Sequence, residues 1–482
     1  MLSRCGGRQC WPSADRDEGP AGPRDASAAD LGKDCALLNA ALVEIECASR
    51  IRDFSIAVVR HDKKLRTAAD RAMFLQKAAA DFQLRFVAGF EDNIRAGKSW
   101  GYATTCNVLS REAAGQPGIE ACKAIAARVS GLDDELIGKI QCKTVSLLAS
   151  SFARHSAMAD CRNGTIRIAA FCRDKSAIVP RLNSQHVSLL VNAFSKWPEE
   201  PTFRQAAVAI ADEVVRRGDR RARLSECSPQ GLSTLVNGFS KWFDEESACK
   251  AIVAIAGEVR RRADCAEIGL SEFVTQGLVA LVNGFSESPE QEDCHHAIVA
   301  IAGAVLSRGS KLSRFAPMEL ASLLNGVSKW PEELPCQKAA IATAREVLSR
   351  RDQIVRFSAH DLSKLVNGFS KWPDDPACRQ ATVVIAREVV RCAVRLPDYT
   401  QQELANLVKG LSKWPQEPAC RRAAVAFAGE VLRRADQDER LSDFNHRDLT
   451  SLVDSFSTWP EEPECRHAID RIARGRHSQG FE

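Results

Sequence analysis

Leu365-Val-Asn-Gly-Phe-Ser-Lys-Trp-Pro373 is the stretch that decides the fold, because variants of it return along the chain. They occupy 190–198, 235–242, 281–289, 323–331, 407–415 and 452–460, and a worn copy stands at 148–153. The fifth residues of the copies are 42, 45, 46, 42, 42, 42 and 45 residues apart: Phe152, Phe194, Phe239, Phe285, Val327, Phe369, Leu411 and Phe456. A fixed period in this range indicates stacked supersecondary units.

Each unit predicts two helices. In the unit 357–392, Ser358 and Asp361 form a capping box that begins the first helix. Pro373 ends it, because a residue before proline is pushed out of the helical region, and Pro376 opens the second helix. The first helix carries apolar residues at helical spacing: Leu362, Leu365, Val366, Phe369 and Trp372. We therefore predict an all-α solenoid of about eight two-helix repeats of 42–46 residues over 141–475.

The flanking segments are less regular. Residues 1–34 are polar and lack aliphatic periodicity, so they are predicted to be disordered, as is a tail at 476–482. Residues 35–140 are predicted to be an irregular helical cap of one or two degenerate repeats, with its least regular loop in the glycine-rich stretch 97–118. Val87–Phe90 echoes the repeated phrase, and Cys122–Val129 echoes the second helix.

Composition narrows the possible classes of protein. The chain has 482 residues, 45% hydrophobic and 27% charged, with a net charge of +4, which is mild for a nucleic-acid-binding protein. It contains no run of about 18 apolar residues, so no membrane span is expected. Of the 18 cysteines, seven recur about once per repeat and are predicted to be buried reduced thiols: Cys161, Cys249, Cys294, Cys336, Cys378, Cys420 and Cys465.

Three recurring positions favour structural roles. The residue before the Phe is always small (Ser, Ala or Gly), which predicts that the next helix packs close to it. The recurring tryptophans lie near the apolar stripe, and core packing is favoured over base stacking or peptide clamping. The arginine clusters 216–217, 260–262 and 433–434 are interpreted as solvated helix ends rather than as a phosphate-binding stripe.

The candidate binding residues are two polar positions of the phrase. At about 100° per residue, the Asn lies on the side of the helix away from the Phe, and the Lys follows four residues later. Three explanations stay open for this row: duplication without a selected role, side-chain bonding between repeats, and a ligand surface that holds an extended peptide or nucleic-acid backbone. The residues are Asn192, Asn237, Asn283, Asn325, Asn367, Lys196, Lys241, Lys329, Lys371 and Lys413.

Motifs of catalysis are missing from the sequence. It has no phosphate loop, no dinucleotide-binding glycine turn, no His-Glu-x-x-His and no zinc-type cysteine spacing. A non-enzymatic chain without cofactor or metal is therefore expected. The alternative is an enzyme whose catalytic part lies before residue 140 or outside this chain.

The phrase Phe-Ser-Lys-Trp-Pro, intact at 194–198 and 369–373, resembles the repeats of the SKWP family of type III secretion effectors of plant-pathogenic bacteria. The resemblance covers about 150–470. It implies a right-handed HEAT/armadillo-like solenoid. It also implies that the chain is a virulence protein that is secreted into the host cytoplasm or nucleus. There we expect a monomer that binds a host protein. Copies depart from the phrase at Phe243, at Glu287-Ser288 and at Thr458.

A second likeness concerns RNA. The stretch Tyr399–Ser412 is similar to the octotricopeptide-type repeats of organellar RNA-binding proteins. It implies the alternative that the same side of the rod binds RNA, with Lys and Arg on phosphates and Asn on bases.

Overall fold

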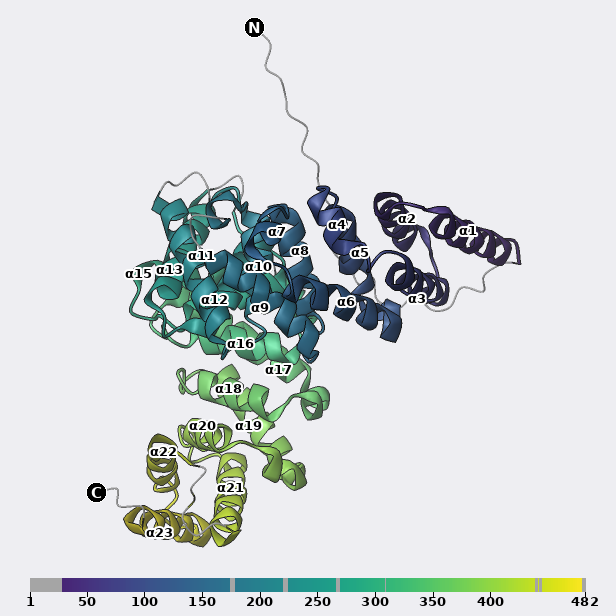
Figure 1. The fold of residues 1–482 in the computed structure, drawn as a ribbon. Helices are drawn as coiled ribbons and strands as arrows, with labels where there is room; N and C mark the ends of the chain where they lie inside the picture. The colour runs from purple at the N-terminus through teal and green to yellow at the C-terminus, as the bar shows by residue number, and fades with distance from the viewer. Residues whose placement is uncertain are drawn as a thin grey trace.

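The computed structural model describes residues 28–478, apart from 174–177, 220–223, 266–268, 308, 438–440 and 442–443. Within these residues the regular elements are all helices, and no strand occurs. Figure 1 shows the helices stacked in chain order, with α1–α3 at one end and α20–α23 at the other. The predicted all-α solenoid is confirmed.

One layer of the solenoid, which we call the A layer, consists of the helices that carry the repeated phrase. Each packs on the next, α8 on α10 and so on to α20 on α22. In the described chain they are α8 (Cys142–Ala153), α10 (Ser184–Phe194), α12 (Pro229–Phe239), α14 (Thr275–Phe285), α16 (Pro317–Val327), α18 (Ala359–Phe369), α20 (Gln401–Leu411) and α22 (His446–Phe456).

The second helices of the repeats form the B layer, in which α9 packs on α11 and so on to α21 on α23. They are α9 (Ala159–Arg173), α11 (Pro201–Asp219), α13 (Glu246–Asp264), α15 (Glu292–Ser307), α17 (Leu334–Ser349), α19 (Pro376–Arg391), α21 (Pro418–Gln437) and α23 (Pro463–Ser478). The 3-10 helices η4 (Gly309–Arg314), η5 (Arg351–Arg356) and η6 (Ala393–Asp398) lead from a B helix to the next A helix. Eight repeats therefore follow one another, as predicted.

The N-terminal cap continues both layers. Helix α2 (Ile51–Lys64) packs on α5 (Trp100–Leu109) and α5 on α8, while α3 (Ala68–Arg85) packs on α6 (Gly115–Ser130) and α6 on α9. Two degenerate repeats, α2–α3 and α5–α6, thus precede the eight regular ones. The first helix, α1 (Ala28–Cys47), packs on α2 and α3.

Details of the cap differ from the sequence-based expectations. Helix α5 lies inside 97–118, where a loop was predicted, because Gly101 lets α5 approach α2: a Cβ there would lie 3.0 Å from Ile51 Cγ1. The predicted equivalence of Val87–Phe90 to the repeated phrase is wrong, since Phe90 begins the short helix α4 (Phe90–Arg95), which lies outside the A layer. The predicted equivalence of Cys122–Val129 to the second helix of a repeat is confirmed, because this stretch lies on α6 in the B layer.

The predicted boundaries of the helical part also shift. Helix α1 begins at Ala28, inside the segment 1–34 predicted to be disordered, and residues 1–27 of that segment lie outside the described residues. At the other end α23 extends to Ser478, beyond the predicted limit of 475, and 479–482 lie outside the described residues.

The ends of the helices follow from local chemistry. Ser358 and Asp361 form the expected capping box: Asp361 N donates to Ser358 Oγ (3.1 Å) and Ser358 N donates to Asp361 Oδ2 (3.2 Å). The A helix ends at Phe369, earlier than expected from Pro373. Ser370 Oγ donates to Asn367 O (2.7 Å), so the serine of the phrase satisfies a terminal carbonyl. The same bond recurs at Ser195, Ser240, Ser286, Ser328 and Ser412.

The small residue before the Phe is the place where successive A helices touch. A methyl group on Gly284, Gly326 or Gly368 would overlap the Val or Leu side chain of the preceding A helix. At Gly410 a Cβ would lie 2.6 Å from Val366 Cγ1. The prediction that this position needs small size is confirmed.

The tryptophans tie each turn to the one before it. The indole Nε1 of Trp372 donates to Pro331 O (2.9 Å), and that of Trp414 donates to Pro373 O (2.8 Å). Trp242 and Trp459 bond in the same way to Pro198 O and Pro415 O. These indoles are buried, so the core-packing interpretation is confirmed.

The arginine clusters are only in part the solvated helix ends that the sequence suggested, because the second arginine of each pair is largely buried while the first stays exposed. Glu258, on the last turns of α13, accepts hydrogen bonds from both Arg261 (2.8 Å) and Arg262 (2.7 Å). The Arg262 side chain is buried and also donates to Cys227 O (2.7 Å), a carbonyl of the loop that precedes α12. Glu213 with Arg217 and Glu430 with Arg434 repeat this arrangement. We call it the Glu–Arg clamp, and it joins a B helix to the loop before its own A helix.

The recurring cysteines are free thiols. Six of the seven are buried, and Cys249 is half-buried. Burial raises the pKa of Cys294, Cys336 and Cys420 to about 12, as expected for thiols in apolar surroundings. They act as small apolar side chains of the B layer, as predicted.

Candidate binding groove

Two positions of the repeated phrase carry side chains without a partner. Gly, Phe, Ser and Trp each have a structural task, but the Asn amides and the Lys ammonium groups form no hydrogen bond or ion pair with the described residues. The amides of Asn192, Asn283, Asn325 and Asn367 are half-buried, and that of Asn237 is exposed. The explanation that the row bonds neighbouring repeats to each other is therefore wrong.

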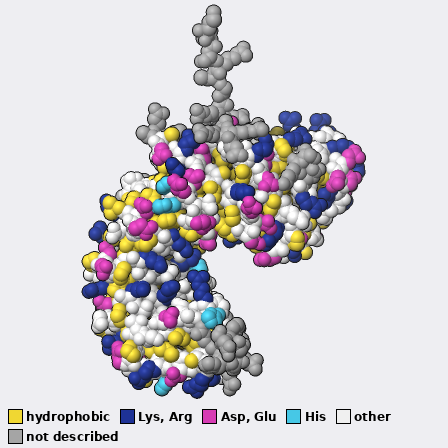
Figure 2. Space-filling model, turned by 90° about the vertical axis from the view of Figure 1, so that its left-hand side faces the viewer, with side chains coloured by type: hydrophobic (Ala, Val, Ile, Leu, Met, Phe, Trp, Pro, Cys, Tyr) yellow, Lys and Arg dark blue, Asp and Glu magenta, His cyan; other side chains and the backbone are white. Residues whose placement is uncertain are grey.

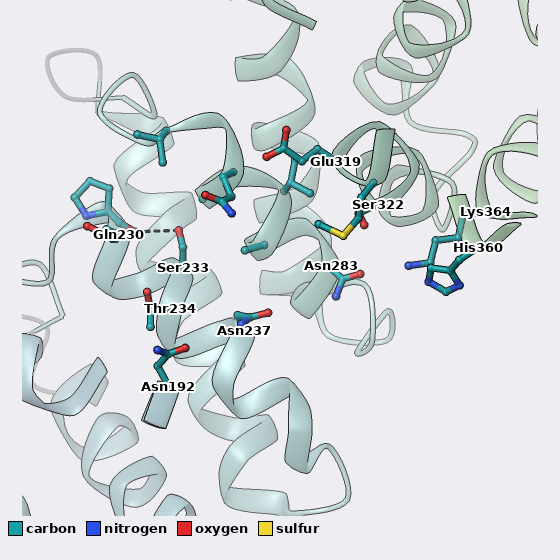
Figure 3. A pocket seen from close by; sticks show the side chains of 17 residues that line it. Asn192, Gln230, Ser233, Thr234, Asn237, Asn283, Glu319, Ser322, His360 and Lys364 are labelled. Carbon is teal, nitrogen blue, oxygen red and sulfur yellow. Dashed lines mark hydrogen bonds between the residues drawn. The ribbon is translucent and has the colours of Figure 1, made fainter. Parts of the chain in front are cut away.

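The Asn row faces a groove on the A layer. A hollow of about 480 Å³ is lined by residues of five successive A helices, from Asn192 on α10 to His360 and Lys364 on α18. One small hollow can reach five stacked helices only if the layer curves around it, so the A layer is the concave side. Figure 3 shows the side chains of Asn192, Asn237 and Asn283 following one another along this surface.

The groove has an apolar edge beside its polar floor. Val274 and Met318 line it at the beginning of α14 and α16, and their side chains are 63% and 61% exposed. Gln230 and Thr234 on α12 add further polar groups to the floor. A groove that alternates amides with exposed aliphatic side chains suits a ligand that is itself partly polar and partly apolar.

The lysines of the row fall into two groups. Lys196 and Lys241 are exposed in the α10 and α12 repeats, and the next repeat has Glu287 at the equivalent position. Beyond it Lys329, Lys371 and Lys413 lie in successive repeats, and the charges of Lys329 and Lys413 help to lower the pKa of Lys371. The structure thus brings together three of the five predicted lysines, and Lys409 joins them from the Asn position of α20.

A second hollow, of about 620 Å³, lies at the C-terminal end of the A layer. It is lined by Lys409 and Lys413 from the α20 repeat and by His446, Arg447 and Asp454 from α22. Lys409, Arg447, Val274 and Met318 were not among the predicted site residues. Lys409 could have been found, because it replaces Asn in the row, whereas the residue types at the other three positions change from repeat to repeat.

The cap contains the strongest departure from ordinary side-chain chemistry, at Cys122 on α6. The Cys106 thiol, and then His155 and Arg154, lower the pKa of Cys122, while the pKa of Cys106 is raised. Both cysteines are 0% exposed, so neither sulfur can meet a substrate as the structure stands. In the described residues no group of three His, Cys, Asp or Glu side chains is placed to hold a metal ion.

Comparison with known proteins adds little to this geometry. No protein-family model and no curated protein matches the sequence. Among solved structures the chain is similar to a "Circular tandem repeat protein with novel repeat topology and enhanced subunit contact surfaces", at 14% identity. That match covers 92% of this chain and 95% of the other, with a TM-score of 0.20. Because this score is low, the description of the fold depends on the helices of this chain and not on the match. None of the described helices combines the length and apolar character that a membrane crossing requires.

Proposed function

We propose that this protein is a non-catalytic scaffold whose concave A layer holds an extended segment of another polypeptide. The observation that carries the proposal is the row of amides, one per repeat, that the fold leaves without partners. An Asn amide both donates and accepts, so it can bond the N–H and the C=O of a peptide backbone. Stacked helices lie about 8–10 Å apart, which is close to the length of three extended residues at about 3.3 Å each.

The exposed aliphatic side chains supply the second requirement of peptide recognition. In an extended ligand, alternate side chains point to opposite sides. Backbone bonds to the Asn row would then leave the ligand side chains that point toward the edge free to contact Val274 or Met318. Main-chain bonds supply affinity and side-chain contacts supply selectivity in such complexes.

RNA is the alternative ligand, and the surface chemistry favours it less. Single-stranded RNA is held by stacking its bases on aromatic rings or on Arg planes. In the described part of the chain the large exposed hydrophobic side chains are all aliphatic, and the recurring indoles bond inward to backbone carbonyls. The Lys residues remain able to contact phosphates, so RNA is retained as a test ligand.

The resemblance to SKWP effectors suggests where the ligand comes from. In this proposal the chain is delivered by type III secretion and the bound segment belongs to a host protein. A translocation assay with the chain fused to a reporter enzyme tests delivery. Reporter signal inside plant cells that depends on a working secretion apparatus is the expected result, and signal that is independent of it would contradict delivery by this route.

The ligand surface is tested by changing Asn192, Asn237 and Asn283 together to Ala. We expect peptides selected from a random peptide array to bind at least about tenfold more weakly, because three backbone bonds of about 1 kcal/mol each are lost. The melting temperature should not fall, since the amides have no partner in the fold and Ala is the better helix former. A matched control removes three amides from the B layer: Asn163→Ala, Gln337→Ala and Gln380→Ala. A lower melting temperature with intact peptide binding would contradict the proposal.

A further inference from the structure

Four lysines of the C-terminal repeats form a cluster on the A layer, which we call the lysine cluster. It consists of Lys329, Lys371, Lys409 and Lys413, contributed by three successive repeats. All four side chains are exposed, and none forms an ion pair with a residue that the structure describes. Figure 2 shows Lys and Arg side chains gathered on the lower arm, where these repeats lie.

The other lysines of the cluster repel Lys371. The pKa of Lys371 lies below its ordinary value, first because surrounding protein removes water from its ammonium group and then because Lys409, Lys329 and Lys413 repel it. Like charges held together destabilise the folded chain unless a counter-charge arrives. The contacts between successive repeats come from the Gly and Trp positions, so the fold does not need the cluster.

The charge of the groove changes along its length. Around the Asn row on α10–α14 the lining is amide, hydroxyl and aliphatic, and Glu287 takes the lysine position of the α14 repeat. Beyond it the cluster begins, and the hollow at its end adds Arg447, with Asp454 as the one carboxylate in its lining. Both hollows lie on the A layer, so one extended chain can cross from the neutral part to the basic part.

We propose that the lysine cluster binds an acidic stretch of the same polypeptide whose neutral stretch lies on the Asn row. This inference rests on the proposed function, and it specifies the ligand as a bipartite segment rich in Asp and Glu at one end. Carboxylates offer the counter-charge that the cluster lacks. An acidic peptide fits better than a nucleic acid because the exposed aliphatic side chains Val274 and Met318 line the neutral part of the same groove, and the described residues expose no Phe, Tyr or Trp ring for base stacking.

Fluorescence anisotropy with defined probes tests the inference. The probes are a labelled peptide that alternates Glu and Ser, its counterpart with Gln in place of Glu, and a single-stranded oligouridylate RNA of similar charge. We expect the Glu peptide to bind, the Gln peptide not to bind, and binding to weaken as salt is added. Replacing Lys329, Lys371, Lys409 and Lys413 with Gln should weaken binding of the Glu peptide by about tenfold or more.

Two further variants keep the result interpretable. The first variant removes the same charge from outside the A layer and should leave binding of the Glu peptide intact. It combines Lys123→Gln, Lys139→Gln, Lys250→Gln and Lys338→Gln. The Asn192, Asn237 and Asn283 triple Ala variant should also keep its affinity for the Glu peptide, so failure of the Asn proposal and failure of this one are separable. Equal loss in the two lysine variants would overturn the inference. So would oligouridylate binding that is tighter than the peptide's and lost with the cluster, because it would assign the cluster to nucleic acid.

Discussion

At the scale of the residue, the repeated phrase divides into positions that build the stack and positions that the stack leaves open. The small residue admits the preceding helix, the Ser satisfies a terminal carbonyl, and in four copies the Trp donates to the Pro carbonyl of the preceding repeat. Only the Asn and the Lys lack a partner within the described residues. The fold therefore leaves these side chains open to water or to a ligand.

Gly326 and Gly303 make a matched pair that tests the small-residue position. Both lie inside helices, where replacing Gly by Ala gains up to about 1 kcal/mol of helix propensity. At Gly326 the added methyl would overlap Val282 Cγ1, so Gly326→Ala should lower the free energy of unfolding by about 1–3 kcal/mol. Gly303 has open space around it, so Gly303→Ala should raise that free energy. Urea unfolding followed by circular dichroism measures both, and equal effects of the two changes would contradict the packing argument.

Residue patterns predicted some of these features and not others. The alternation of Gly with Ala and Ser in one column predicted close packing, because size was the shared property. The clusters Arg216-Arg217 and Arg261-Arg262 did not predict the clamp. Their spacing from Glu213 and Glu258 is visible in the sequence, but the carbonyls that the second Arg reaches lie about 35 residues upstream. Such a contact depends on tertiary structure and leaves no local pattern.

At the scale of the element, the Glu–Arg clamp fixes the end of a B helix to the loop that begins its repeat. Burial alone would raise the pKa of Glu258, but hydrogen bonds from Arg261 and Arg262 outweigh it, so the pKa lies below its ordinary value. The pKa values of Glu213 and Glu430 are lowered for the same reasons. Because the charged carboxylate is favoured in the folded chain, protonation removes part of the clamp's contribution.

The clamp therefore predicts how stability depends on pH. Stability from Glu258 is fully present above the unfolded pKa of Glu, about 4.3, and is lost as pH falls through the lower folded pKa. We expect Glu258→Gln to lower the free energy of unfolding at neutral pH by about 2 kcal/mol and to flatten its decline in acid. The control is Glu332→Gln, an exposed glutamate outside the ion pairs of the described chain. Urea unfolding over a pH series measures both, and parallel pH profiles for Glu258→Gln and wild type would show that the clamp is not the acid-sensitive element.

At the scale of the whole molecule, the stack is modular while the groove is continuous. Each A helix contacts its neighbours in the layer, so stability should be close to a sum over repeats and their shared surfaces. The groove is different, because its hollow draws on five A helices at once. A change in the number of repeats should consequently affect binding far more than folding.

Deletion of one whole module, residues 328–369, tests this separation. The deletion joins Val327 to Ser370. Val327 and Phe369 hold the same position in the phrase, so Ser370 takes the place of Ser328 and each remaining helix keeps its caps. Helix α20 would then pack on α16, with Gly410 against Leu324 in the way that Gly368 packs there now. We expect unchanged helicity per residue and one cooperative unfolding transition. Binding of a bipartite peptide should fall, because the deletion brings the Asn row and the lysine cluster one repeat closer and removes Lys329 and Asn367.

Deleting only 349–369, half a module, should remove an A helix without its B helix and expose the apolar face of α19. If the half deletion unfolds as cooperatively as the whole one, then the two-helix repeat is not the unit of stability. If the whole deletion binds the bipartite peptide as tightly as wild type does, then the number of repeats does not set the length of the ligand.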